Sequence, residues 1–184
     1  IASSHRAQFN GASIYTAGDY RTPLGAVKVN MDLSKELVSR HPSISFIPEA
    51  HATEHSIEVQ LPFIQYRLGN DIQIVPIVLG SSSIRAARDL ARALLPYFNA
   101  GNLFVVSSDF SHYPGYQDAI HTDSLTGLAI MNKDPEVFYN TLKKFSSEPV
   151  RNLVTTCCGW SAVMTLLYMA AERPELSFSK KKKK

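Results

Sequence analysis

Two short apolar runs separated by an amphipathic segment restrict the fold of this chain more than any other feature. Residues 72–79 and 103–107 are rich in β-branched side chains, which is typical of buried strands. Between them, residues 83–95 place isoleucine, leucine and alanine on one face of a helix, with serine available as its N-cap. A strand, a helix and a second strand in this order indicate a parallel crossover. The sequence therefore predicts an α/β fold.

Further strands and helices are predicted on both sides of this crossover. Short strands are expected at 12–15 and 26–29 around a turn at 22–25, with a weaker strand at 45–47. An apolar stripe indicates a helix that begins near His55, kinks or restarts at Pro62 and ends before Gly69. The remaining helices are expected at 32–40, 117–131, 134–145 and 159–172.

The composition indicates one domain in a reducing compartment. The 184 residues, 45% of them hydrophobic, suffice for one sizeable core. The only two cysteines, Cys157 and Cys158, are adjacent and cannot join distant parts of a fold, so a secreted disulfide framework is excluded and a cytoplasmic location is expected. No apolar run approaches the ~20 residues of a membrane helix, so we expect no membrane partner.

The net charge of +3 depends on a lysine run at 180–184. Without that run, 14 basic residues stand against 16 acidic ones, a net charge of −2. We interpret the run as a disordered tail or an artefact in preference to a nucleic-acid-binding arm. No other basic stripe supports nucleic-acid binding, and the chain has no P-loop, dinucleotide-binding glycine motif or G-x-S-x-G motif.

Polar side chains directly follow two predicted strands. His5 follows an apparent strand end at 1–2, while Asp109 and His112 follow the strand at 103–107. In open α/β sheets, ligands bind at the carboxyl ends of the strands. A carboxylate three residues from an imidazole can orient it or share a metal ion with it. Alternatively, Asp109 caps a turn and His112 is a surface residue.

Cys157 and Cys158 lie just before the last predicted helix. Unpaired N–H groups at a helix start favour a thiolate, which can act as a metal ligand or a nucleophile. The alternative is that both cysteines are small buried hydrophobic residues, and for Cys157 we prefer it.

Glu54, His55 and Glu58 form a second titratable cluster near a predicted helix start. Acidic residues in a first turn often only complement the helix dipole. Residues 51–55 also match H-x-x-E-H, the inverted zincin pattern, which needs one helix through His51 and His55. Because Pro48 lies close upstream, a continuous helix through both histidines is disfavoured, and so is a zincin.

Taken in order, these motifs resemble those of the Memo-like protein family. The matching stretches cover the chain from Ile1 to about Phe178, and the most specific are Glu-His-Ser-Ile-Glu at 54–58 and Ser-Ser-Asp-Phe-Ser-His at 107–112. The weaker stretches are Ser4-His5, 20–25, 59–63, 75–80 and Cys158-Gly159.

The resemblance implies the fold of the class III extradiol ring-cleaving dioxygenases. This is a three-layer α/β sandwich with a mixed, largely parallel central sheet flanked by helices. The single domain would span residues 1–179 and be shortened at both ends, with a further metal histidine of the family in an upstream His-Ala-Gly-Tyr-like motif. In bacteria and archaea the family stands beside a radical-SAM protein and an AMMECR-type protein, which are therefore expected functional partners.

The resemblance also implies roles for individual side chains. It assigns metal ligation to His5, Asp109 and Cys158, with the cysteine in place of the dioxygenase carboxylate. The catalytic side chains would be Glu54, His55 and His112, the last as the acid/base histidine. Thiolate and imidazole ligands suit Fe(II) or copper, and zinc as well.

Three functions remain open. The first is a metal-dependent, dioxygenase-like oxidoreductase that acts on a phenolic small molecule. The second is a binding module in which the pocket holds a metal ion or a phosphopeptide without turnover. The third is a hydrolase with Cys158 as nucleophile, His112 as base and Asp109 as orienting group.

Overall fold

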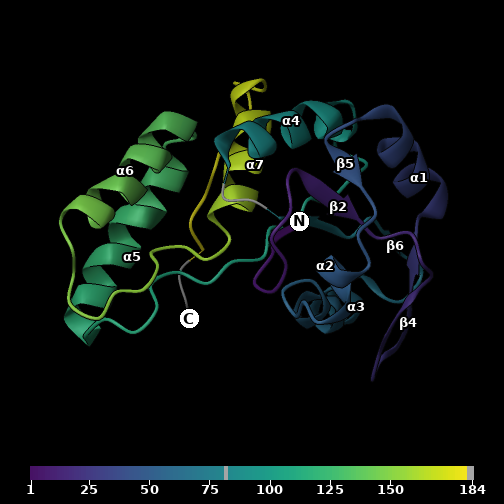
Figure 1. The fold of residues 1–184 in the computed structure, drawn as a ribbon, viewed down its shortest axis with the longest axis horizontal. Helices are drawn as coiled ribbons and strands as arrows, with labels where there is room; N and C mark the ends of the chain where they lie inside the picture. The colour runs from purple at the N-terminus through teal and green to yellow at the C-terminus, as the bar shows by residue number, and fades with distance from the viewer. Residues whose placement is uncertain (81–82, 182–184) are drawn as a thin grey trace.

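A mixed four-stranded sheet forms the centre of the fold (Figure 1). The computed structural model describes residues 1–80 and 83–181. The strands of the central sheet pair β1 with β7 and β2 with β5 in parallel, whereas β2 and β7 are antiparallel. In spatial order they are β1 (Ala2–Ser3), β7 (Ile77–Leu79), β2 (Ala12–Ile14) and β5 (Ile44–Ser45).

A second, three-stranded sheet contains β3 (Tyr20–Thr22), β4 (Gly25–Val29) and β6 (Gln73–Ile74). The first two form a hairpin whose tight turn requires a left-handed residue, and Gly25 supplies it with φ of +121°. The single strand predicted at 72–79 is therefore wrong, because β6 and β7 belong to different sheets. Pro76 between them has no N–H for a continuous ladder, and its carbonyl accepts from the Tyr15 N–H at 3.1 Å.

Helices lie on both faces of the central sheet and complete three layers. Figure 1 shows α4 and α7 on one side and α2 and α3 on the other, which confirms an α/β sandwich. Most predicted helices agree with the structure to within two residues. The helices are α1 (Met31–Arg40), α2 (Glu49–Ala52), α3 (Leu61–Leu68), α4 (Ile84–Leu94), α5 (Tyr116–Met131), α6 (Pro135–Ser147) and α7 (Trp160–Ala171).

The helix predicted to begin near His55 starts later than expected, but its restart at Pro62 and its end before Gly69 are confirmed. Helix α2 ends at Ala52, and a 3₁₀ turn (Glu58–Gln60) precedes α3. Pro62 lies in the first turn of α3, where its missing N–H has no intrahelical partner to lose. No helix joins His51 to His55, so the inverted zincin pattern is excluded.

Residues 103–107 were predicted to form a strand, but they make no regular strand in the structure. The segment nevertheless runs beside β1. The Ile1 N–H donates to the Val105 carbonyl at 2.7 Å, and the Ser107 N–H donates to the Ile1 carbonyl at 3.0 Å. This is one parallel bridge, and a ladder needs several. The bonds place the segment parallel to β1 and β7, so the predicted crossover through α4 has the expected direction.

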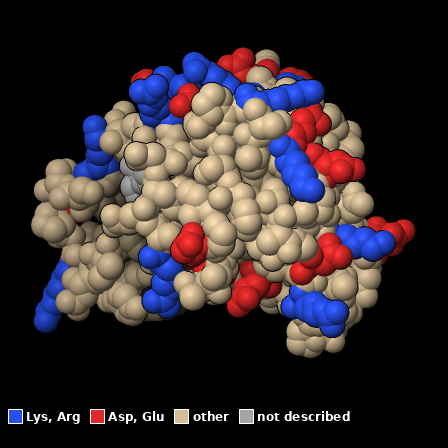
Figure 2. Space-filling view, turned by 45° about the vertical axis from the view of Figure 1, so that its right-hand side comes forward, with Lys and Arg blue, Asp and Glu red and all other residues tan. Residues whose placement is uncertain are grey.

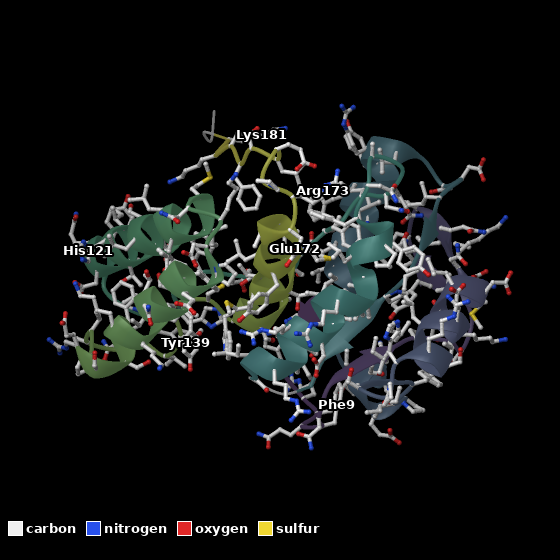
Figure 3. The ribbon with its side chains drawn as sticks, turned by 90° about the horizontal axis from the view of Figure 1, so that it is seen from above. Phe9, His121, Tyr139, Glu172, Arg173 and Lys181 are labelled. Atoms are coloured by element: carbon white, nitrogen blue, oxygen red, sulfur yellow. The ribbon has the colours of Figure 1, made fainter. Side chains whose placement is uncertain are left out.

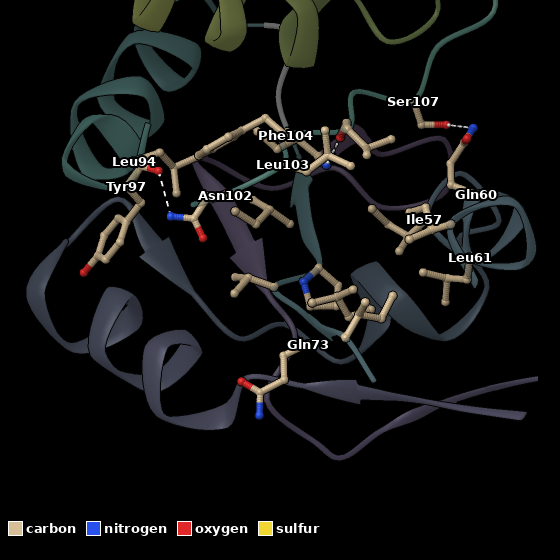
Figure 4. A pocket seen from close by; sticks show the side chains of 18 of the residues that line it. Ile57, Gln60, Leu61, Gln73, Leu94, Tyr97, Asn102, Leu103, Phe104 and Ser107 are labelled. Atoms are coloured by element: carbon tan, nitrogen blue, oxygen red, sulfur yellow. Dashed lines mark hydrogen bonds between the residues drawn. The ribbon is translucent and has the colours of Figure 1, made fainter. Parts of the chain in front are cut away.

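The edge of the segment 103–107 that faces away from β1 has no neighbouring strand within the described residues. The peptide groups of Phe104 and Val106 point away from β1 and form no backbone hydrogen bond within residues 1–80 and 83–181. Beside them lies a mainly apolar cavity of about 370 Å³ (Figure 4). Its walls come from α1, α3, α4 and residues 72–77, and a hydrogen bond of 3.0 Å from Gln60 to Ser107 closes one side.

Helices α5 and α6 lie to one side of α7, as the view from above in Figure 3 shows. The rings of Tyr139 on α6 and Trp160 on α7 are 6.1 Å apart, which ties the two parts together. After α7, the Arg173 guanidinium donates to the Phe98 carbonyl at 2.8 Å. The lysine run at 180–184 was predicted to be a disordered tail or an artefact. Residues 182–184 of this run lie outside the described part of the chain.

The charged side chains give no direct sign of function. On the face in Figure 2, Lys and Arg alternate with Asp and Glu around an uncharged centre. Within the described residues, no helix combines the length and hydropathy needed to cross a bilayer.

Candidate functional site

The loop after residues 103–107 is bonded to the start of α7. The Asp109 N–H donates to the Cys158 sulfur at 3.1 Å, and the Cys158 N–H donates to the Asp109 carbonyl at 3.2 Å. The Gly159 N–H donates to the Ser108 hydroxyl at 2.9 Å. A Cβ atom on Gly159 would lie 2.4 Å from the Ser107 carbonyl oxygen, so only glycine permits this approach. The two loops thereby hold Cys158 against Asp109.

Asp109, His112 and Cys158 form the first of two groups that could hold a metal ion. One ligand atom from each lies within 4.8 Å of the other two, and His112 Nε2 is 3.7 Å from Asp109 Oδ2. The Asp109 side chain is 83% exposed and that of His112 is 30% exposed. The structure brings these three side chains together, and the group is accessible from solvent.

The two adjacent cysteines differ sharply. Cys157 is 1% exposed, and burial raises the pKa of its thiol to about 11, although the Ser108 hydroxyl at 3.1 Å opposes this shift. The interpretation of Cys157 as a small buried residue is confirmed. Cys158 is partly exposed and lies in the metal-ligand group.

His5, Glu54 and His55 form the second group, again with ligand atoms within 4.8 Å of one another. Glu54 is its centre, because both imidazoles approach the same carboxylate oxygen. His5 Nδ1 lies 3.1 Å and His55 Nδ1 3.5 Å from Glu54 Oε1. The two histidine rings are 5.1 Å apart.

The Glu54 carboxylate is ionised although almost no water reaches it. Burial raises its pKa, but hydrogen bonds from the His5 and Ser56 N–H groups and the His5 ring outweigh burial and lower the pKa to about 2. The charge is therefore held by N–H donors.

The structure divides the predicted metal ligands between the two groups. Asp109 and Cys158 lie together, whereas His5 lies with Glu54 and His55. Both groups stand at the same edge of the sheet, since His5 follows β1 and Asp109 follows the segment parallel to it. Gln60 reinforces this arrangement because its bond to Ser107 joins the chain after Glu54 to the chain before Asp109.

The hydrolase alternative lacks its central contact. Within the described residues, no hydrogen bond joins His112 to Cys158, although that bond is the hallmark of an activated thiol. The nearest donor to the Cys158 sulfur is the main chain of Asp109.

Two features of the site were missed by sequence reasoning. The Ser108 hydroxyl lies 3.1 Å from the Cys157 sulfur and 3.8 Å from the Cys158 sulfur, and its position beside Asp109 was the only available signal. The second feature is the contact of His51 with β2. Its Nε2 lies 2.9 Å from Ser13 Oγ, and burial lowers the pKa of His51 to about 4.

The donor set of the first group fits a transition-metal ion. Metal–ligand distances of ~2.0–2.3 Å put ligand atoms on one ion at most about 4.5 Å apart. The ligand atoms of this group lie within 4.8 Å of one another, which is close to that separation. A thiolate, an imidazole and a carboxylate suit iron, copper or zinc.

Comparison with known proteins decides the family. The family model for Memo-like proteins matches residues 1–182. The chain belongs to the Memo-like family. A MEMO1 family protein from Thermoplasma acidophilum is 34% identical over 173 residues, which are 94% of this chain and 61% of that protein. A MEMO1 family protein from Thermotoga petrophila is 36% identical over 173 residues, which are 92% of this chain and 58% of the relative.

These Memo-like relatives confirm the resemblance seen in the motifs. The chain spans about three fifths of the length of the curated relatives that it matches. The names of these relatives state no substrate and no metal.

Proposed function

We propose that this Memo-like chain binds Fe(II) or copper at the edge of its central sheet and oxidises a phenolic small molecule there, with molecular oxygen as the oxidant. The observation that carries the proposal is the grouping of Asp109, His112 and Cys158, whose ligand atoms lie within 4.8 Å of one another. These residues come from two loops that main-chain hydrogen bonds tie together. Such a fixed scaffold limits the rearrangement that metal binding requires.

Cys158 and Asp109 of the first group would hold the ion, and His5 would reach it from the second group at the neighbouring strand end, which leaves the His112 ring free. A bound iron or copper ion supplies a one-electron redox couple and Lewis acidity. The Asp109 N–H that points at the Cys158 sulfur stabilises negative charge on that sulfur, which favours its role as a ligand.

His112 would move the proton of the phenolic hydroxyl. Its ring is partly exposed, and its Nε2 atom lies 3.7 Å from a carboxylate oxygen of Asp109. A histidine that is open to a substrate and lies beside a carboxylate has the geometry for general acid/base catalysis.

Elemental analysis of anaerobically purified protein tests the proposal. We expect close to one iron or copper ion per chain in the parent protein and loss of the ion in Cys158→Ala and His5→Ala. His121→Ala is the matched control, because His121 is an exposed histidine of α5 outside both groups (Figure 3). Equal metal loss in the control, or no metal in the parent protein, contradicts the proposal.

An oxygen-uptake measurement with catechols then separates an enzyme from a binding module. We expect uptake that depends on the bound metal and falls strongly in His112→Ala. Stoichiometric metal without uptake for any phenol would leave a metal-binding module instead of an oxidoreductase.

A further inference from the structure

We infer that Glu54 is a positioning residue that fixes His5 in the tautomer with a free Nε2 atom. The inference rests on the proposed function, because it concerns the ring that would be a metal ligand. It assigns Glu54 a role outside the metal coordination shell, in place of direct participation in catalysis.

The Glu54 side chain is surrounded by N–H groups. It is 1% exposed, and one of its oxygens accepts the His5 main-chain N–H at 2.6 Å. The other oxygen accepts the Ser56 N–H at 3.0 Å and lies 3.1 Å from His5 Nδ1. Glu54 therefore binds both the main chain and the side chain of His5.

These contacts determine which nitrogen of His5 carries the hydrogen. Both oxygens of Glu54 already accept main-chain N–H groups, so this side chain acts as an acceptor and Nδ1 of His5 is the donor across the 3.1 Å contact. In a neutral imidazole the other nitrogen, Nε2, then bears the lone pair. Glu54 thus selects the atom through which His5 can bind a metal ion.

The same contacts make Glu54 a poor ligand itself. An ion bound to either oxygen would compete with N–H donors that stabilise the buried carboxylate. The group of His5, Glu54 and His55 is consequently an orienting cluster rather than a second metal centre. Carboxylates that accept the distal N–H of a histidine ligand are a common second layer in metal sites, and their loss typically lowers metal affinity ~10–100-fold.

The tautomer of His5 in the metal-free protein is the direct test. Long-range ¹H–¹⁵N correlation spectra distinguish a protonated from an unprotonated ring nitrogen, and His5→Ala identifies the His5 signals. We expect Nδ1 protonated and Nε2 unprotonated in the parent protein near pH 8. The opposite tautomer, or an even mixture of the two, overturns the inference.

Glu54→Gln supplies the second arm. The glutamine amide replaces one acceptor oxygen by an N–H₂ group, so it can no longer accept all the N–H groups of His5 and Ser56. We therefore expect a mixture of His5 tautomers and a metal affinity reduced ~10–100-fold. Glu58→Gln is the control, since Glu58 is an exposed carboxylate of the same segment. Unchanged tautomer and affinity in Glu54→Gln overturns the inference, and if that variant does not fold, the parent spectrum alone decides.

These measurements separate the inference from the proposed function. A fixed Nδ1-protonated tautomer in a protein that binds no metal would refute the proposed function and leave the role of Glu54 intact. Metal bound through Cys158 in a protein whose His5 tautomers exchange freely would support metal binding and refute the role of Glu54.

Discussion

Glu54 and His5 show what sequence reasoning can and cannot provide at the scale of single residues. Both were predicted as site residues from their motifs, yet they are 49 positions apart and nothing in the sequence pairs them. Their contact depends on the irregular segment after α2, which brings Glu54 to the chain that follows β1. The grouping of Asp109 with Cys158, in contrast, was predictable because both lie next to recognisable elements.

The ionisation of Glu54 predicts a loss of stability in acid. Its pKa is about 2 in the folded protein against 4.5 ordinarily, so the carboxylate stabilises the fold above about pH 4.5, and this contribution disappears as the pH falls toward 2. At ~1.4 kcal/mol per pKa unit, the loss is on the order of 3 kcal/mol. Urea denaturation at pH 6 and pH 3 measures the part of this loss that occurs above pH 3, which is about 2 kcal/mol. A Glu54→Gln variant with the same pH dependence as the parent protein would contradict the assignment.

The two cysteines are predicted to react at very different rates. Cys158 is partly exposed, whereas Cys157 is buried and its raised pKa keeps it a neutral thiol. Iodoacetamide at pH 8 should therefore modify Cys158 at least ~10-fold faster than Cys157. Peptide mass spectrometry over time measures both rates, and Cys158→Ser should remove the fast phase. Faster modification of Cys157 would contradict the burial of its thiol.

At the scale of elements, helices were more predictable than strands. Amphipathic periodicity and caps indicated α4 and α6, where Ser83 and Asp134 accept N–H groups of the first turn. Strands of two or three residues have too few positions for periodicity, and apolar runs do not reveal to which sheet each part belongs. The helix predicted to begin near His55 had a real apolar stripe, and Pro62 marks the first turn of α3, which is the restart that the sequence allowed.

Two glycine substitutions are predicted to have opposite effects on stability. Gly159→Ala places a methyl group 2.4 Å from the Ser107 carbonyl oxygen and must separate the two loops of the site, which we expect to cost ~1–3 kcal/mol. Gly127→Ala lies within α5, where the nearest atom would be 3.8 Å away, and should gain ~0.5–1 kcal/mol. Thermal unfolding monitored by circular dichroism tests both. A neutral Gly159→Ala would disprove the tight contact.

At the scale of the whole molecule, the three-layer arrangement brings the site residues to one edge. The resemblance predicted this α/β sandwich, and the structure confirms it with a mixed sheet between two helix layers. The likeness to extradiol dioxygenases stays a prediction, because an α/β sandwich hosts many chemistries.

Metal binding is predicted to stabilise the whole fold. The first metal-ligand group joins the loop before α5 to the start of α7, so an ion there should cross-link the central sheet to both helices. At a free-metal concentration 100 times the Kd, the gain is ~2.7 kcal/mol. A thermal shift on adding Fe(II) without oxygen measures it, and Cys158→Ala should remove the shift. An equal shift in that variant would mean that the ion binds elsewhere.

The open edge at Phe104 and Val106 affects how solutions of this chain should behave. Peptide groups that have no backbone partner within the described residues lie beside an apolar hollow and form a surface to which another extended strand can add, and Leu103 at its rim is 71% exposed. A net charge of only +3 gives weak electrostatic repulsion between molecules. Colloidal stability should therefore decrease with concentration and with added salt, and the first contacts between molecules should form along residues 103–106.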